Sequence, residues 1–296
     1  MTDFSVKKKA YAKINLTLEI LGTKRDDGYH DISSVMHKIP LCDELFFCVN
    51  KNAAKNGVKL QAAGNEIPCD IKDNLAYRAA EKYLEKYTQN SGKTAEISIK
   101  LQKIIPSGAG LAGGSADAAC VLRALFETLG SISEKELFSV ALSLGSDVPF
   151  CLSEHTCALC TGRGEIMTIL PPLSEVYLSV IFPSEPLITA GIYAEYDRAY
   201  GEDYGKDKSE KFAYALSENR DKEEILSYMT NDFEDLCEKK CGSVKKAREM
   251  LAKDGAKALM TGSGSAVYGI FTDKEKFEKS KGKTYENGWK RFDYAL

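Results

Sequence analysis

A glycine-rich stretch in the first half of the chain has the composition of a phosphate-binding loop. Residues 104–125 read IIPSGAGLAGGSADAACVLRAL, with four glycines between two apolar segments. Glycine permits positive φ angles and lets phosphate oxygens approach the main chain where a Cβ would collide. The unpaired N–H groups and the dipole at the start of the following helix favour an anion. The stretch therefore predicts a loop for nucleotide phosphates, against the alternative that the glycines only make a tight turn.

Two other phosphate loops do not fit. The spacing Gly108-x-Gly110-x-x-Gly113 matches a dinucleotide site, but that fold needs a strand and an acidic residue about 20 residues further on. Here a second helix is predicted instead. A Walker A loop requires GxxxxGK[ST], and the near matches at residues 92–94 and 282–284 lack the first glycine.

The elements that must position this loop can be predicted from periodicity. Residues 10–21, AYAKINLTLEIL, alternate with period two, which predicts a half-buried strand with Lys13 and Asn15 on the face away from the core. Helices are predicted over 73–88 and 115–129, and a strand leads into the loop. A further helix begins at the Ser133 capping box, and strands and helices alternate irregularly after it.

Length and composition bound the remaining possibilities. A chain of 296 residues predicts two domains, which we place at 1–154 and 155–296. The net charge of −3 argues against nucleic acid and anionic membranes as partners. No stretch is long and apolar enough to span a membrane, so a cytoplasmic protein is expected. The nine cysteines are expected to be unpaired thiols, with zinc at Cys157/Cys160 or Cys237/Cys241 as the alternative.

Several segments carry a family resemblance. PSGAGLAGGSADAA, residues 106–119, resembles the central phosphate-binding motif of the GHMP kinases. Residues 10–45, which contain AKIN and GYH, resemble the opening of the members that act on 4-diphosphocytidyl-2-C-methyl-D-erythritol (CDP-methylerythritol). DNLAYRAA, GSDVPFCL, TGRGE and TGSGSAVYGIF follow in that group's order, so the resemblance covers nearly the whole chain.

The resemblance implies a fold and a reaction. The implied fold is the α+β, two-domain GHMP kinase fold, with a ribosomal protein S5 domain 2-like N-terminal domain, a ferredoxin-like C-terminal domain and a cleft between them. The reaction is the transfer of the ATP γ-phosphoryl to the 2-hydroxyl of CDP-methylerythritol in the non-mevalonate (MEP) route to isoprenoid precursors. ATP and Mg²⁺ are the implied cofactors, and a monomer or weak homodimer is expected.

The resemblance also implies catalytic residues. Asp147, in GSDVP, matches the general base that accepts the hydroxyl proton. Lys13 matches a catalytic lysine that would keep Asp147 ionised and offset developing charge. Without the resemblance, Asp147 reads as a cap for the turn after Gly145, and Lys13 as an ordinary exposed lysine.

Substrate-binding residues are implied in both halves of the chain. Tyr29 matches an aromatic that stacks on the cytosine, and His30 matches its hydrogen-bonding neighbour; alone, His30 reads as a loop histidine. The remaining matches are Asn15, Thr189, Tyr193, Gly262, Ser263 and Gly264. Tyr193 would close the other side of the base, and the Gly262–Gly264 turn would face the diphosphate or be a plain hairpin turn.

Nucleotide-binding residues are implied around the loop. Asn74 and Leu75 match an adenine pocket and also suit a helix start, and the two roles are compatible. Ser115 is an N-cap, a phosphate ligand or a magnesium ligand. The loop residues are Pro106, Ser107, Gly108, Ala109, Gly110, Leu111, Gly113, Gly114 and Ser115.

Two rival functions remain. One is a GHMP kinase with another acceptor, such as homoserine or mevalonate, against which the Tyr29-His30 pair argues. The other is a nucleotide-binding regulator without catalysis, against which the presence of both Lys13 and Asp147 argues.

Overall fold

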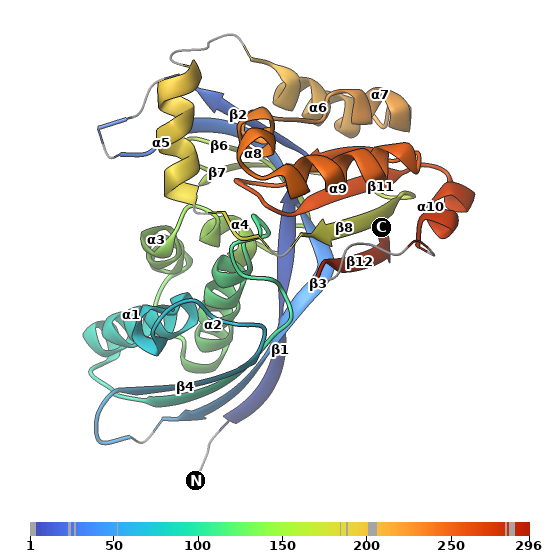
Figure 1. Cartoon of the computed structure of the whole chain (residues 1–296). Helices are drawn as coiled ribbons and strands as arrows, with labels where there is room; N and C mark the ends of the chain where they lie inside the picture. Colours follow the sequence, from blue (N-terminus) through green and yellow to red (C-terminus); the bar gives the residue numbers. More distant parts are fainter. Residues whose placement is uncertain are drawn as a thin grey trace. The chain divides into compact units, whose positions relative to one another are not determined.

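The structure is a computed structural model that describes residues 4–22, 25–26, 28–51, 53–183, 185–187, 189–200, 206–281, 283 and 288–296 (Figure 1). It divides into two compact units. The first unit comprises Met1–Ala12, Pro40–Ser107 and Ala112–Glu154, and the second comprises Lys13–Ile39, Gly108–Leu111 and His155–Leu296. The chain last passes between the units after Glu154, while two earlier segments group with the second unit. The assignment of nucleotide and substrate roles to 1–154 and 155–296 stays a prediction.

The first unit is a sheet covered by helices. Its strands are β1 (Phe4–Asn15), β3 (Asp31–Asn50), β4 (Gly57–Gly64) and β5 (Glu96–Lys103), of which β1 and β3 continue into the second unit. Strand β5 pairs antiparallel with β3 and parallel with β4. Its helices are η1 (Ile71–Asp73), α1 (Leu75–Ser91), α2 (Gly113–Leu129), α3 (Glu134–Leu144) and α4 (Val148–Leu152).

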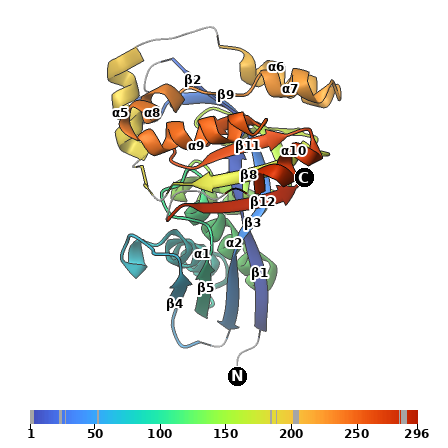
Figure 2. The ribbon, with the colours of Figure 1, turned by 45° about the vertical axis from the view of Figure 1, so that its right-hand side comes forward.

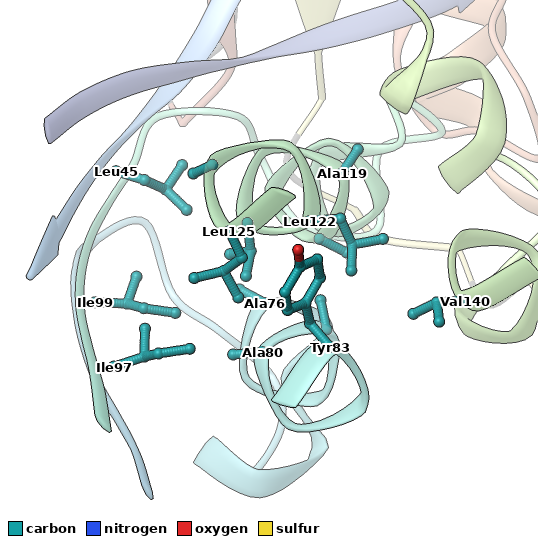
Figure 3. Packing of buried hydrophobic residues seen from close by; sticks show 14 of the residues in the cluster. Leu45, Ala76, Ala80, Tyr83, Ile97, Ile99, Ala119, Leu122, Leu125 and Val140 are labelled. Atoms are coloured by element: carbon teal, nitrogen blue, oxygen red, sulfur yellow. The ribbon is translucent and has the colours of Figure 1, made fainter. Parts of the chain in front are cut away.

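Alternating apolar residues of this sheet form the core with two helices. Figure 3 shows Ile97 and Ile99 of β5 pointing toward Ala80 of α1 and Leu125 of α2. The ring of Tyr83 is fully buried between the helices, and its hydroxyl donates to the carbonyl of Gly130 at 2.8 Å. The apolar stripe of α2 therefore holds the glycine loop at its N-terminus against a packed sheet.

The second unit contains a four-stranded antiparallel sheet in the order β10-β11-β8-β12. These strands are β8 (Tyr177–Phe182), β10 (Lys257–Met260), β11 (Val267–Phe271) and β12 (Lys290–Ala295). Short strands complete the unit beside β3: β2 (Thr17–Leu21), β6 (Cys157–Thr161), β7 (Ile166–Leu170) and β9 (Thr230–Asn231).

The helices of the second unit are α5 (Thr189–Tyr200), α6 (Lys208–Ser217), α7 (Lys222–Ser227), α8 (Glu234–Lys240), α9 (Gly242–Lys253) and α10 (Lys274–Lys281). Figure 2 shows α9 lying along β11. A Cβ at Gly269 of β11 would lie 3.2 Å from the Cβ of Leu251, so glycine lets α9 pack closely there. The mixture of helices and largely antiparallel strands confirms the predicted α+β class.

The strand predicted over residues 10–21 is confirmed, as the end of β1 followed by β2 with a break at Leu16. The prediction that its polar face lies away from the core is wrong, because Lys13 is 3% exposed, Asn15 1% and Glu19 2%. The reason is that their polar atoms have partners within the unit. The Glu19 carboxylate, for example, accepts from the N–H groups of Lys208 and Ser209 at the start of α6, which covers that face.

A buried histidine makes stability depend on pH. Nδ1 of His37 lies 2.6 Å from the carbonyl oxygen of Lys38, to which it donates, and Nε2 accepts from the N–H of Leu173 at 3.1 Å. Burial lowers the pKa of His37 from 6.5 to about 4. The neutral ring is therefore built into the fold.

Because the folded pKa lies below the unfolded one, the stabilisation is complete above pH 6.5 and is lost as pH falls toward 4. We expect urea denaturation to show that this group lowers the free energy of unfolding by about 3 kcal/mol over that range. The figure follows because each unit of pKa difference corresponds to about 1.36 kcal/mol. His37→Gln should flatten that dependence, whereas His155→Gln, at an exposed position, should keep it. Equal slopes in all three proteins would contradict this account.

Candidate functional site

The N-terminus of α2 carries no side-chain cap. Asn74 caps α1 and Ser133 caps α3, each through a side-chain oxygen that accepts a first-turn N–H. The N-cap of α2 is Ala112, whose φ is 54° and whose side chain has no polar atom. First-turn amides without such a cap suit a bound anion.

Two loop glycines in the first unit differ in the space that the protein leaves for a side chain. A Cβ at Gly113 would lie 2.9 Å from Cγ2 of Ile105, so packing excludes a larger residue. A Cβ at Gly114 would meet only Cδ1 of Leu75, at an ordinary 3.5 Å. Protein packing thus accounts for Gly113 but not for Gly114, which agrees with a ligand that approaches the main chain at Gly114.

The predicted adenine residues lie next to this loop. The side chain of Asn74 accepts from the N–H of Ala76 at 2.9 Å, so it does begin a helix. Leu75 is the neighbour of Gly114 just described.

The other predicted loop residues of the first unit are Pro106, Ser107 and Ser115. Pro106 is buried, and the hydroxyl of Ser107 donates to the carbonyl of Glu66 at 2.9 Å. The half-buried Ser115 lies in the first turn of α2.

A buried charged cluster, which the sequence analysis missed, lies at the base of the loop. Nζ of Lys103 contacts the carboxylates of Asp43 and of Asp117, the latter at 2.8 Å. Asp43 also accepts from the N–H groups of Ile104 (2.5 Å) and Ile105 (2.8 Å), which fixes the end of β5. Burial raises the pKa of Asp117, and the neighbouring ammonium of Lys103 opposes that shift.

Asp147 belongs to the first unit, at the N-cap position of α4. Its carbonyl accepts from the N–H of Cys151 at 3.0 Å, but its carboxylate makes no cap hydrogen bond. The side chain is half-buried. The alternative that this carboxylate serves as a helix cap therefore has no support.

The loop segment 108–111, in the second unit, is held through its main chain. Carbonyls of this segment accept from the N–H groups of Lys13 (3.1 Å), Leu187 (3.3 Å) and Ala266 (3.1 Å). At Gly110, φ is +74° and a Cβ would lie 2.2 Å from the carbonyl oxygen of Thr261. The tight-turn explanation therefore holds for Gly110, because chain packing alone requires glycine there.

Lys13 and Asn15 form one hydrogen-bonded group. Nζ of Lys13 donates to Oδ1 of Asn15 at 2.6 Å. The Asn15 side chain donates to the hydroxyl of Ser34 at 2.8 Å, and its main-chain N–H donates to the hydroxyl of Thr261 at 3.0 Å. The expectation of an exposed Lys13 is wrong, since these partners let the cation be buried in a fixed position.

The turn at Gly262–Gly264 is anchored by residues far away in the sequence. The amide of Asn231 donates to the carbonyls of Met260 (2.8 Å) and Gly262 (2.9 Å). The hydroxyls of Ser263 and Thr189 lie 2.7 Å apart. The structure thus brings together two of the predicted substrate residues, at the start of α5.

The predicted cytosine residues lie in the second unit. His30 is 5% exposed and stacks on Tyr193, with ring centroids 5.3 Å apart and an interplanar angle of 28°. Nε2 of His30 lies 2.7 Å from Oδ1 of Asp197. Tyr29 is 43% exposed, and the guanidinium of Arg163 lies 4.3 Å from its ring centroid.

Some of these partners left a signal in the sequence and others did not. Asp197 lies four residues after Tyr193, so both share one helix face, and Thr261 directly precedes the glycine turn. Asp43 and Asn231 left none, because they are separated from their partners Lys103 and Gly262 by 60 and 31 residues.

Metal and membrane features are few. Within the described ranges, no three His, Cys, Asp or Glu side chains form a group that could hold a metal ion. All nine cysteines are free thiols. None of the described helices combines the length and apolar character needed to cross a bilayer.

Comparisons with known proteins place the chain among kinases. The family model of the GHMP kinases N terminal domain matches residues 74–155, and that of the GHMP kinases C terminal matches 212–282. The 4-diphosphocytidyl-2-C-methyl-D-erythritol kinase of Moorella thermoacetica is 39% identical over 270 residues, covering 90% of both chains. The enzyme of that name from Desulfotalea psychrophila is 38% identical over 275 residues, covering 89% of this chain and 84% of the relative.

Solved structures agree. A crystal structure of 4-(cytidine 5'-diphospho)-2C-methyl-D-erythritol kinase matches with a TM-score of 0.72 and 32% identity over 93% of both chains. A crystal structure of homoserine kinase from Cytophaga hutchinsonii matches with a TM-score of 0.71 and 18% identity. The match covers 100% of this chain and 96% of that kinase and shows a shared fold. The chain therefore belongs to the GHMP kinase family, in the group of 4-diphosphocytidyl-2-C-methyl-D-erythritol kinases, and it is an ATP-dependent small-molecule kinase.

Proposed function

We propose that this kinase transfers the γ-phosphoryl group of ATP to the 2-hydroxyl of CDP-methylerythritol, in the MEP route to isoprenoid precursors. The observation that carries the proposal is identity of 36–39% to kinases named for this substrate, over about nine-tenths of the chain. The uncapped start of α2 beside Gly114 supports it physically, because it offers main-chain amides to a phosphate.

Phosphoryl transfer needs alignment and charge stabilisation more than covalent chemistry. The ammonium of Lys13, held by Asn15, is a buried and preoriented positive charge for the transferring group. Asp147 is the proposed general base, because its segment GSDVP matches the motif that carries the base in this family. Aspartate is a weak base in water, so it must act through its position.

Magnesium fits the donors of the first unit. Mg²⁺ takes hard oxygen ligands and is held mostly by substrate phosphates and one or two protein groups. The hydroxyl of Ser115, in the uncapped first turn of α2, is a donor of that kind. Bound there, the ion would neutralise phosphate charge.

The acceptor can be identified directly. In a coupled ADP-release assay we expect turnover with CDP-methylerythritol and less than about 1% of that kcat/KM with homoserine or mevalonate, because a site built for polar groups rejects ligands that leave them unpaired. A higher kcat/KM for homoserine or mevalonate than for CDP-methylerythritol would refute the proposed acceptor.

Replacing the proposed base tests the mechanism. Asp147→Asn should lower kcat roughly 100-fold or more with little change in either KM, since general-base catalysis contributes about that much. The matched control is Asp235→Asn, an exposed aspartate of α8, which should keep full activity. Undiminished turnover in Asp147→Asn would remove this residue from the mechanism.

Two glycine variants separate packing from phosphate binding. Gly110→Ala places a Cβ against the Thr261 carbonyl at positive φ, so it should destabilise the fold by about 2 kcal/mol. Gly114→Ala has room within the protein, so the melting temperature should hold or rise while the KM for ATP increases at least about tenfold. ATP binding by Gly114→Ala as tight as in the parent protein would argue against phosphate contact at Gly114.

A further inference from the structure

The imidazole of His30 is paired with the carboxylate of Asp197. Nε2 lies 2.7 Å from Oδ1 of Asp197, and the His30 side chain is 4% exposed while that of Asp197 is 40% exposed. An ionised carboxylate can only accept hydrogen bonds. With Asp197 ionised, Nε2 therefore carries the proton and donates a hydrogen bond to the carboxylate.

The same helix fixes the face of the ring. Tyr193, one turn before Asp197 on α5, stacks on His30. Tyr193 in turn packs edge-on against Phe233, at 4.7 Å and 71°. Two residues on one face of α5 thus hold the imidazole. Asp197 contacts its Nε2, and Tyr193 stacks on its ring.

The second ring nitrogen is left as an acceptor. A neutral imidazole that is protonated on Nε2 has a lone pair on Nδ1. Among the described residues, the hydrogen bond found for the His30 ring is the one between Nε2 and Asp197. The lone pair on Nδ1 can therefore accept from a ligand that reaches the ring.

We propose that Asp197 is a positioning residue that makes this kinase select cytosine over uracil. By holding the proton on Nε2, Asp197 keeps Nδ1 of His30 an acceptor for an exocyclic amino group. Cytosine has that amino group at its C4 position, whereas uracil has a carbonyl oxygen, which would face the Nδ1 lone pair. The inference rests on the proposed function, because it assumes that the base of the substrate is bound at His30.

The chain provides an internal reference for the protonation state. His37 has the opposite arrangement, since its Nδ1 donates to a carbonyl and its Nε2 accepts from an N–H. With three histidines in all, a ¹⁵N spectrum of the imidazole nitrogens can be assigned by substitution. We expect His30 in the Nε2–H form and His37 in the Nδ1–H form at pH 8.

Asp197→Ala should convert His30 to a mixture of the two neutral forms and leave His37 unchanged. The matched control is Glu195→Ala, which removes a carboxylate from the same helix that pairs with Lys240 instead, and it should leave both histidines as they were. An Nδ1–H form of His30 in the parent protein, or a doubly protonated ring at pH 8, would overturn the proposal.

Selectivity is the second readout. The ratio of kcat/KM for CDP-methylerythritol to that for its uridine counterpart should fall about tenfold in Asp197→Ala, on the scale of one net hydrogen bond. Asp197→Asn should restore most of the ratio, because its amide oxygen can still accept from Nε2. If Asp197→Ala turns over the cytidine substrate with an unchanged ratio, the role of Asp197 is refuted and the proposed function stands. No turnover of the cytidine substrate by the parent protein refutes the proposed function, while the spectrum still tests the proton on His30.

Discussion

The arrangement of the second unit depends on one close approach of main chain to main chain. The Cα of Gly110 lies so near the carbonyl of Thr261 that no Cβ fits between them, and a Cβ at Gly262 would lie 2.8 Å from the carbonyl oxygen of Gly110. This contact joins the glycine loop to the turn between β10 and β11. Since the N–H of Lys13 also bonds the loop and that of Asn15 bonds Thr261, the end of β1 is fixed by the same contact.

Packing requires some of the loop glycines, and the proposed phosphate contact would explain another. Gly108, Gly110 and Gly113 are required by neighbouring protein atoms, at 2.7, 2.2 and 2.9 Å from an added Cβ. Gly114 is not, and it lies at the helix start that no side chain caps. If the loop also exposes amides to an anion, as proposed, packing and phosphate binding together would explain the density of glycine better than either alone.

Burial of polar groups is the second theme. Lys13, Asn15 and Glu19 lie on a strand that alternates like a surface strand, yet all are buried. Burial of such groups costs free energy unless they are hydrogen-bonded, and here each has partners within the unit. The Asp43, Lys103 and Asp117 cluster repeats this arrangement at the base of the loop. These networks fix side chains in single orientations, which is what a site for aligned reactants needs.

Local spacing in the sequence was enough to predict the strand, loop and helix around residues 104–125 and the capping box at Ser133. Motifs that are contiguous in the chain were enough to identify the family, and the family implied the α+β class. The tertiary structure decided which polar residues are buried and with what they pair. Asn231 under the glycine turn, Asp43 under the loop and Asp197 beside His30 all meet partners distant in the sequence. Periodicity reports how residues repeat along one element, and it carries no information about which other element will cover that face.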